Sequence, residues 1–372
     1  MEVKPFFFDM SGEEIAEFQE GAAKILRSGT LILGDYTARF EKAFADYIGS
    51  KHAILVNSGS TALEILLRLK KVSGKTVLVP TNTNFATVAS IIRAGGNVRY
   101  LDMDPKTFAP TLAMVQTELN RIPDIAGVVW VHIAGIISPD FKAVVDHCRR
   151  HGVFVIEDAA HAHGSQVSGL KAGRLADGAA FSFFPTKVMT TGEGGMITTH
   201  SDEEDYLARS YRNQGKRGTN YGGLHHDFGN SSRMTELQAL LGLIQLRKLA
   251  EMLRKRSVAA WAITKELQRV GIQYCKTSHM DMASNYKLIV LLPESRSRES
   301  VKKACAEVGI ILGGGVYELP CHRQPVFEGI CAGGTYPGAE RWCPNHICPP
   351  LTSGMTEDEA RFVGEMLVKH LT

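Results

Sequence analysis

The sequence predicts an α/β protein with a mostly parallel seven-stranded sheet flanked by helices, followed by a smaller C-terminal α+β domain. The chain has 372 residues, of which 44% are hydrophobic, and this length can bury a core large enough for two domains. Up to about residue 200, short apolar and β-branched runs alternate with helical patterns. This alternation is typical of parallel strands joined by crossover helices.

The expected elements follow one another from the first turn of helix. Residues Ser11 to Glu14 fit a capping box, and apolar residues recur behind them at helical spacing. A loop over residues 29–34 leads to a second helix, in which Phe40 and Phe44 are expected in the core. The expected strands lie near residues 53–57, 76–79, 97–101, 126–131, 153–157, 179–184 and 196–199.

The C-terminal part has a different organisation. A long helical pattern runs from Met234 towards Val270 and leads out of the first domain. The expected elements after it are a strand at 286–292 and helices at 297–308 and 357–371. We place the boundary near residue 250, which gives a large domain of residues 1–250 and a small domain of residues 251–372.

Composition and charge exclude several classes of function. The net charge is +3 without a long basic block, so we expect no nucleic acid and no anionic membrane as a partner. No apolar run approaches the roughly 18 residues of a membrane span, and residues 1–9 do not resemble a signal peptide. The seven cysteines are an odd number spread along the chain, which favours a reducing cytoplasm over a disulfide framework.

A group of cysteines and histidines near the C-terminus raises the question of zinc. The spacing C-x-x-H-x-C is not that of a usual zinc knuckle, and no matching C-x-x-C pair exists. We therefore predict no metal site. The group consists of Cys321, His322, Cys331, Cys343, His346 and Cys348.

Lys187 is the residue around which we expect the chemistry to be organised. It lies between an apolar, aromatic run at 179–184 and a β-branched run at 196–199, close to a glycine-rich turn. Desolvation there would lower the pKa of the amine and leave a neutral fraction able to form a Schiff base. The alternative is a surface lysine whose stem covers apolar residues.

Two motifs upstream of this lysine have complementary chemistry. Asp158 follows the strand at 153–157, at the sheet edge where α/β proteins bind ligands. Its carboxylate could pair with a protonated pyridine nitrogen, or could cap a helix or contact a metal or a ribose. Gly59, Ser60 and Thr61 begin a helix after a strand, where free amides can hold a phosphate, although such residues are also ordinary N-caps.

In this order along one chain, the three motifs resemble the DegT/DnrJ/EryC1/StrS family of sugar aminotransferases. The family consists of pyridoxal phosphate enzymes with the aspartate aminotransferase-like fold, fold type I. The resemblance covers nearly the whole chain and is most specific over residues 157–164, at Thr186-Lys187 and over residues 192–195. It implies that Lys187 holds pyridoxal 5'-phosphate as a Schiff base and that Asp158 keeps the pyridine nitrogen protonated.

The resemblance also assigns supporting residues. His161 is expected against the phenolic oxygen of the cofactor, and Gly59, Ser60, Thr61 and Ser182 are expected at its phosphate. The expected substrate-side residues are His132, Tyr317 and His322. A lone histidine such as His132 could equally be a buried polar group with its hydrogen bonds satisfied.

The chain departs from the family pattern at two positions. Where the family has an aromatic residue stacked on the cofactor ring, this chain has Asn84, and the aromatic residue follows at Phe85. Either Phe85 covers the ring or the amide of Asn84 does, and Phe85 could instead be a core residue of the next helix. The asparagine that the family supplies to the phosphate in the neighbouring subunit corresponds to Asn230, displaced by one residue.

The function implied by the resemblance is a ping-pong transamination. The amino donor would be glutamate or glutamine, the acceptor a keto-sugar that is commonly nucleotide-linked, and the assembly a homodimer with shared active sites. A keto-cyclitol acceptor remains an alternative, whereas a sugar 3-dehydratase of this family would have histidine in place of Lys187. A non-catalytic sensor with the same fold is a further alternative, which the intact Asp158 and Lys187 disfavour.

Overall fold

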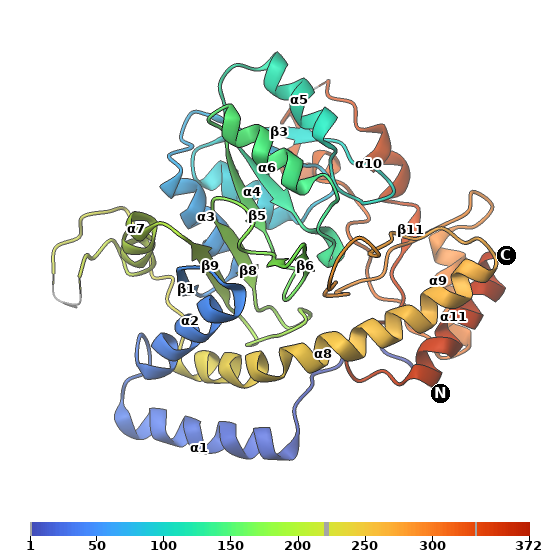
Figure 1. Cartoon of the computed structure of the whole chain (residues 1–372), viewed down its shortest axis with the longest axis horizontal. Coiled ribbons are helices and arrows are strands. Elements are labelled where there is room, and N and C mark those ends of the chain that lie inside the picture. The colour runs from blue at the N-terminus through green and yellow to red at the C-terminus, as the bar shows by residue number, and fades with distance from the viewer. Residues whose placement is uncertain (1, 219–222, 332) are drawn as a thin grey trace.

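The computed structural model describes residues 2–218, 223–331 and 333–372. A central sheet is surrounded by helices, and the long helix α8 (Glu236–Arg269) runs below the sheet and above α1 in Figure 1 towards the C-terminal elements. The helices α1 (Gly12–Ser28) and α2 (Asp35–Ile48) pack against α8. As predicted, α1 begins with a capping box, in which Ser11 Oγ accepts from the Glu14 amide at 3.2 Å and Glu14 Oε2 accepts from the Ser11 amide at 2.8 Å.

The sheet has seven strands in the spatial order β1-β9-β8-β5-β4-β2-β3. Strand β9 is antiparallel to both of its neighbours, and all other adjacent pairs are parallel. The predicted α/β fold with a mostly parallel seven-stranded sheet is therefore confirmed. The strands are β1 (His52–Val56), β2 (Thr76–Pro80), β3 (Asn97–Leu101), β4 (Ile125–Val131), β5 (Phe154–Asp158), β8 (Ala179–Ser182) and β9 (Gly195–Thr199).

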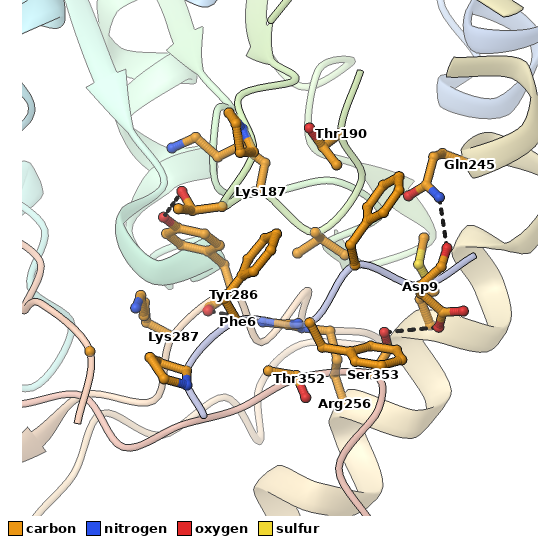
Figure 2. A pocket seen from close by; sticks show the side chains of 18 of the residues that line it. Phe6, Asp9, Lys187, Thr190, Gln245, Arg256, Tyr286, Lys287, Thr352 and Ser353 are labelled. Atoms are coloured by element: carbon orange, nitrogen blue, oxygen red, sulfur yellow. Dashed lines mark hydrogen bonds between the residues drawn. The ribbon is translucent and has the colours of Figure 1, made fainter. Parts of the chain in front are cut away.

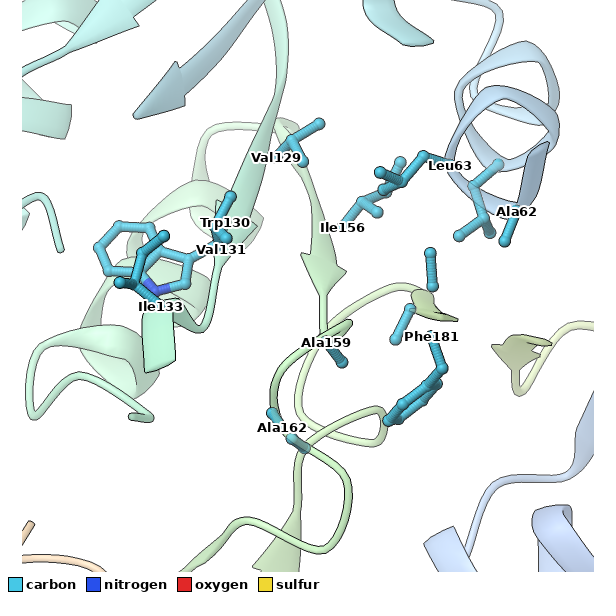
Figure 3. Close-up of a cluster of buried hydrophobic side chains, with 14 of the residues drawn as sticks. Ala62, Leu63, Val129, Trp130, Val131, Ile133, Ile156, Ala159, Ala162 and Phe181 are labelled. Atoms are coloured by element: carbon cyan, nitrogen blue, oxygen red, sulfur yellow. The ribbon is translucent and has the colours of Figure 1, made fainter. Parts of the chain in front are cut away.

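Crossover helices cover the faces of this sheet, so most residues of its strands are buried. Figure 3 shows Val129, Ile156 and Phe181 of three neighbouring strands with Leu63 of the crossover helix α3. Full burial of such a side chain contributes about 1.5–3 kcal/mol to folding. Because both faces of the sheet are covered, its strands read in the sequence as apolar, β-branched runs and not as alternating patterns. The crossover helices are α3 (Gly59–Leu69), α4 (Phe85–Arg93), α5 (Leu112–Arg121) and α6 (Phe141–Arg150), and a further helix, α7 (Asp202–Arg212), follows the last strand of the sheet.

The C-terminal region is built on α8 and a small antiparallel pair. The strand predicted at 286–292 is too long, because only Val290–Leu291 (β10) pairs, with His346–Ile347 (β11). The predicted helices are found as α9 (Arg298–Glu307) and α11 (Glu357–Leu371). The remaining short elements are η1 (Ile133–Gly135), β6 (Gln166–Val167), β7 (Leu170–Lys171), η2 (Cys321–Arg323), η3 (Pro325–Phe327) and α10 (Pro337–Trp342).

Helix α8 crosses the predicted domain boundary without interruption. Most of its buried apolar residues up to Leu253 belong to the core around the sheet, although Leu240 and Ile244 pack with Ile25 of α1 instead. Those from Ala259 onward belong to a second core with α11. Val3 also lies in this second core. The division into residues 1–250 and 251–372 stays a prediction. In the described part of the chain, no helix combines the length and the apolar character that crossing a membrane requires.

Candidate active site

A cavity of about 330 Å³ lies at the edge of the sheet where the parallel strands end. Val131, Asp158 and Ser182 are the last residues of β4, β5 and β8, and all three line it. Carboxyl ends of parallel strands meet at one edge, which is where α/β proteins bind ligands. The predicted site residues that this cavity brings together are Gly59, Ser60, Asn84, Asp158, His161, Ser182, Lys187 and Tyr317.

Lys187 approaches the cavity over an aromatic ring. Its Nζ lies 4.9 Å from the centre of the Tyr286 ring, which favours a cation at that point. Burial nevertheless lowers the pKa of Lys187 to about 8, against the opposing effect of the Asp158 carboxylate, and the charge of Lys287 lowers it further. The amine is thus neutral in a large fraction of molecules at mildly alkaline pH.

Asp158 is a buried acid held in a fixed orientation. The Thr87 hydroxyl donates to Oδ2 at 2.8 Å, and the Ala160 amide donates to Oδ1 at 3.2 Å. Burial raises the pKa of Asp158, although these two hydrogen bonds and the charge of Lys187 act to lower it. A cation placed against this carboxylate would therefore be stabilised strongly, because little water competes there.

His161 is held as the neutral imidazole. The Ala134 amide donates to Nδ1 at 3.3 Å, so the ring proton is assigned to Nε2, which faces the Tyr317 hydroxyl at 3.2 Å. Burial lowers the pKa of His161 well below its usual value, and the charges of Lys187 and Lys287 add to this effect. The ring stacks on Tyr286 with centroids 4.2 Å apart, so Tyr286 supports both His161 and Lys187.

The start of helix α3 forms the opposite wall. Ser58 Oγ accepts from the Thr61 amide at 3.1 Å and caps the helix, and the amides of the first turn of any helix lack intrahelical acceptors. Gly59 is required here because a Cβ would lie 2.8 Å from Ser182 Cβ. Glycine therefore allows the start of α3 and Ser182 to lie close together, and the first-turn amides of α3 could bind an anion in the cavity.

Two of the remaining predicted residues lie outside the cavity and have other partners. The Thr61 hydroxyl donates to Asn57 Oδ1 at 2.8 Å within the cap. Phe85 is 47% exposed and stacks on Phe327 with ring centroids 5.4 Å apart. Asn84, which faces the cavity, also caps helix α4 by accepting from the Ala86 amide at 2.9 Å.

The two substrate-side histidines are also outside it. His132 is fully buried, and its Nε2 lies 2.9 Å from Glu157 Oε2. His322 Nδ1 lies 2.6 Å from the Thr81 hydroxyl oxygen. Asn230 is exposed on the loop before α8 and does not reach this cavity within the protomer.

Three polar residues of the cavity are not among those predicted from the sequence. Thr87, which holds Asp158, lies 71 residues away along the chain, and nothing in the sequence links the two. Ser58 precedes the glycine that was selected, and the N-cap preference of serine is its signal. Glu193 lies in the glycine-rich turn after Lys187 and lines the cavity as well.

The cysteines and histidines near the C-terminus contact different parts of the chain. Cys321 Sγ lies 3.2 Å from the Thr83 carbonyl oxygen, and His346 Nε2 accepts from the Val316 amide at 2.9 Å. Within the described ranges, no three residues among His, Cys, Asp and Glu are grouped so that they could hold a metal ion.

Known proteins resemble this chain over most of its length, both in sequence and in structure. GDP-perosamine synthase from Caulobacter vibrioides is 35% identical over 332 residues, which cover 88% of this chain and 81% of that protein. The pleiotropic regulatory protein of Geobacillus stearothermophilus is 32% identical over 352 residues, covering 93% and 92%. NtdA from Bacillus subtilis, solved with bound cofactor PMP, superposes with a TM-score of 0.87 at 25% identity, covering 97% and 83%. The profile of the DegT/DnrJ/EryC1/StrS aminotransferase family matches residues 13–368, and the chain therefore belongs to this family.

Proposed function

We propose that this aminotransferase uses pyridoxal phosphate to move an amino group from glutamate or glutamine to a nucleotide-linked keto-sugar in ping-pong steps. The observation that carries the proposal is the single cavity in which Lys187 meets a buried acid, Asp158, and the open helix start at Gly59. A reactive amine, an acid for a pyridine nitrogen and a phosphate site are the three groups that this cofactor needs.

The residues present fit the cofactor. The cavity of about 330 Å³ falls within the roughly 300–1,000 Å³ of small-molecule and cofactor sites. Gly59, Ser60 and Ser182 would hold the phosphate, and Asp158 would pair with the ring nitrogen. Because a Cβ at Gly59 would meet Ser182, glycine is the residue that lets these two phosphate-side groups lie close together.

Bound pyridoxal phosphate supplies an aldehyde for a Schiff base with Lys187 and a ring that accepts electrons. The lysine must be deprotonated to act as nucleophile, and later it must accept and return a proton at Nζ. The lowered pKa of about 8 for Lys187 suits both tasks near neutral pH. Neutral His161 offers its Nε2 proton as a hydrogen-bond donor, and Asn84 lines the cavity where the family has an aromatic residue.

The acceptor is inferred from the relatives. GDP-perosamine synthase from Caulobacter vibrioides and a UDP-N-acetyl-3-dehydro-α-D-glucosamine 3-aminotransferase from Acidithiobacillus ferrooxidans are both named for amino sugars on nucleotide carriers. These names support a nucleotide-linked keto-sugar as the acceptor of this chain.

The following experiment tests the proposed function. The purified protein is loaded with pyridoxal phosphate, reduced with borohydride and digested, and the modified peptide is identified by mass spectrometry. We expect the label on Lys187 only, and we expect L-glutamate to bleach the unreduced protein, because the amine is transferred to the cofactor. A label elsewhere would contradict the assignment. Cofactor retention without conversion of any keto-sugar would favour a regulatory role, as the name of the Geobacillus stearothermophilus relative suggests.

We further propose a homodimer in which the loop before α8 reaches the site of the other subunit. Leu224 and Phe228 on this loop are 78% and 95% exposed, which is costly for apolar side chains on a free surface. Phe228→Asp is expected to produce monomers in sedimentation velocity and to weaken cofactor retention, because Asn230 lies on the same loop. Trp261→Asp, at an exposed position of α8, is the control. A fully active monomer would contradict the proposal.

A further inference from the structure

A second cavity, of about 180 Å³, adjoins the first and shares Lys187 with it. Figure 2 shows that the N-terminal segment, helix α8 and the loop after α8 contribute its walls. Phe6, Tyr286, Lys287 and Arg256 surround the space below Lys187 in that view. This second cavity is enriched in cations, which the chemistry of the cofactor does not by itself require.

Arg256 is buried in the wall without a carboxylate partner. The side chain of this α8 residue is 8% exposed. Its Nε and Nη2 donate to the carbonyl oxygen of Asn285 at 3.1 and 2.9 Å, and Nη2 also donates to that of Tyr286 at 3.0 Å. No acceptor for Nη1 exists among the described residues. Burial lowers the pKa of Arg256 to about 10, so the guanidinium remains charged at neutral pH.

Lys287 adds a second cation beside the first. Its Nζ lies 5.7 Å from the centre of the Tyr286 ring, the same ring that Lys187 Nζ approaches to 4.9 Å. Neither a carboxylate nor another acceptor meets this ammonium in the described part of the chain. A Cβ at Gly313 would lie 2.8 Å from Lys287 Nζ. Glycine at this position therefore leaves the ammonium room to face the cavity.

The one acid in the wall is already engaged. Asp9 Oδ1 lies 3.1 Å from Lys248 Nζ, and Asp9 Oδ2 accepts from the Ser353 hydroxyl at 3.0 Å. Asp9 therefore does not neutralise Arg256 or Lys287. Cations removed from water without a partner are destabilising, and such an arrangement persists where an anionic ligand completes it.

We propose that Arg256 and Lys287 form a subsite for the carboxylate of the amino donor, next to the amine-transferring Lys187. This inference rests on the proposed function. The volume supports a small carboxylate rather than a nucleoside diphosphate, because about 180 Å³ is below the roughly 300 Å³ at which sites for larger ligands begin. The donor's amino group would then face Lys187, while its charged end is held by two cations.

The test measures binding without turnover. Glutarate has the carboxylates of glutamate but no amino group, so its affinity for the cofactor-loaded enzyme can be measured by isothermal titration calorimetry. We expect Lys287→Met to weaken glutarate binding at least about tenfold, as loss of a hydrogen bond to a charged group does. We also expect it to raise KM for L-glutamate more than KM for the keto-sugar. Lys287→Arg should restore most of the affinity.

Lys276→Met, which removes an exposed lysine of the same region, is the matched control and should bind glutarate like the wild type. The proposal is overturned if the wild type does not bind glutarate, or if Lys287→Met binds it normally. It is also overturned if Lys287→Met loses affinity for a nucleoside diphosphate but not for glutarate, since the cations would then serve the acceptor. Glutarate binding that depends on Lys287 in a protein without transaminase activity would refute the proposed function alone.

Discussion

Lys187→Ala is expected to lower kcat for transamination by more than about 10⁴-fold. The loss combines the missing nucleophile with the missing proton carrier, and proton transfer alone contributes about 10²–10⁴-fold. No other lysine of the cofactor cavity can replace it, because Lys187 is the single lysine among the residues described there. The rate is measured as keto-sugar amination under saturating glutamate. A variant that aminates at the wild-type rate would remove Lys187 from the mechanism.

The same variant has a stability signature in the cofactor-free protein. The pKa of Lys187 is about 8 in the folded protein and about 10.4 in an unfolded chain. Between these values the unfolded chain binds more protons, so the stability of the wild type rises with pH. Lys187→Ala should therefore melt higher than the wild type at pH 7, and this advantage should shrink towards pH 10. Lys276→Ala should show no such dependence.

The second large effect is expected for Asp158→Asn. A neutral amide cannot hold the proton on the pyridine nitrogen, and we expect kcat to fall at least about 100-fold. The amide fits the site, because its oxygen can still accept from the Ala160 amide that now bonds Oδ1 at 3.2 Å. The cofactor should still bind, although more weakly. Wild-type kcat in this variant would place the essential acid elsewhere.

Melting curves with and without cofactor check this assignment independently. Burial raises the pKa of Asp158 in the folded protein, so its carboxyl group favours folding at low pH and this contribution is lost as pH rises through the folded pKa. Without cofactor, Asp158→Asn should melt higher than the wild type at neutral pH and lose that advantage towards pH 4. With cofactor the order should reverse, because the wild-type carboxylate gains a cationic partner.

The arrangement of the site could be predicted where the sheet alone determines it. Parallel strands bring their carboxyl ends to one edge, so residues after β1, β5 and β8 had to meet. Local patterns therefore predict Asp158 and Gly59 at this edge, whereas Ser182 is expected there from the family resemblance. Tyr286 could not be found in this way, because its place beneath both Lys187 and His161 depends on packing between segments about 100 residues apart.

The sequence alone leaves open whether Asn84 or Phe85 faces the cofactor, and the surroundings of Phe85 show why. Asn84 caps α4 through the Ala86 amide, and this cap fixes where the helix begins. Phe85 is then the first helical residue, and its ring turns to Phe327. Phe85 and Phe327 are 242 residues apart along the chain, so local propensity contains no information about their contact.

His132 illustrates the opposite case, in which a chemically attractive residue has a structural partner. Its ring contacts Glu157, whose carboxylate also accepts from the amides of Gly173, Leu175 and Ala176 at 2.8–3.1 Å. Successive residues of a strand point to opposite faces, so Glu157 faces away from the side occupied by Asp158. Of these two adjacent acids, Glu157 therefore holds a loop in place and Asp158 lines the cavity.

The position of Val3 affects how this protein can be recombined with its relatives. The core between the second half of α8 and α11 includes this residue from the other end of the chain, and residues 5–9 continue from it along the wall beside Lys187. A chimera that exchanges only the residues after 250 would pack the N-terminal segment of one protein against the C-terminal core of the other. Segments that pack together must be exchanged together, even when they are far apart in the sequence. A functional chimera must therefore transfer the first nine residues together with the C-terminal third.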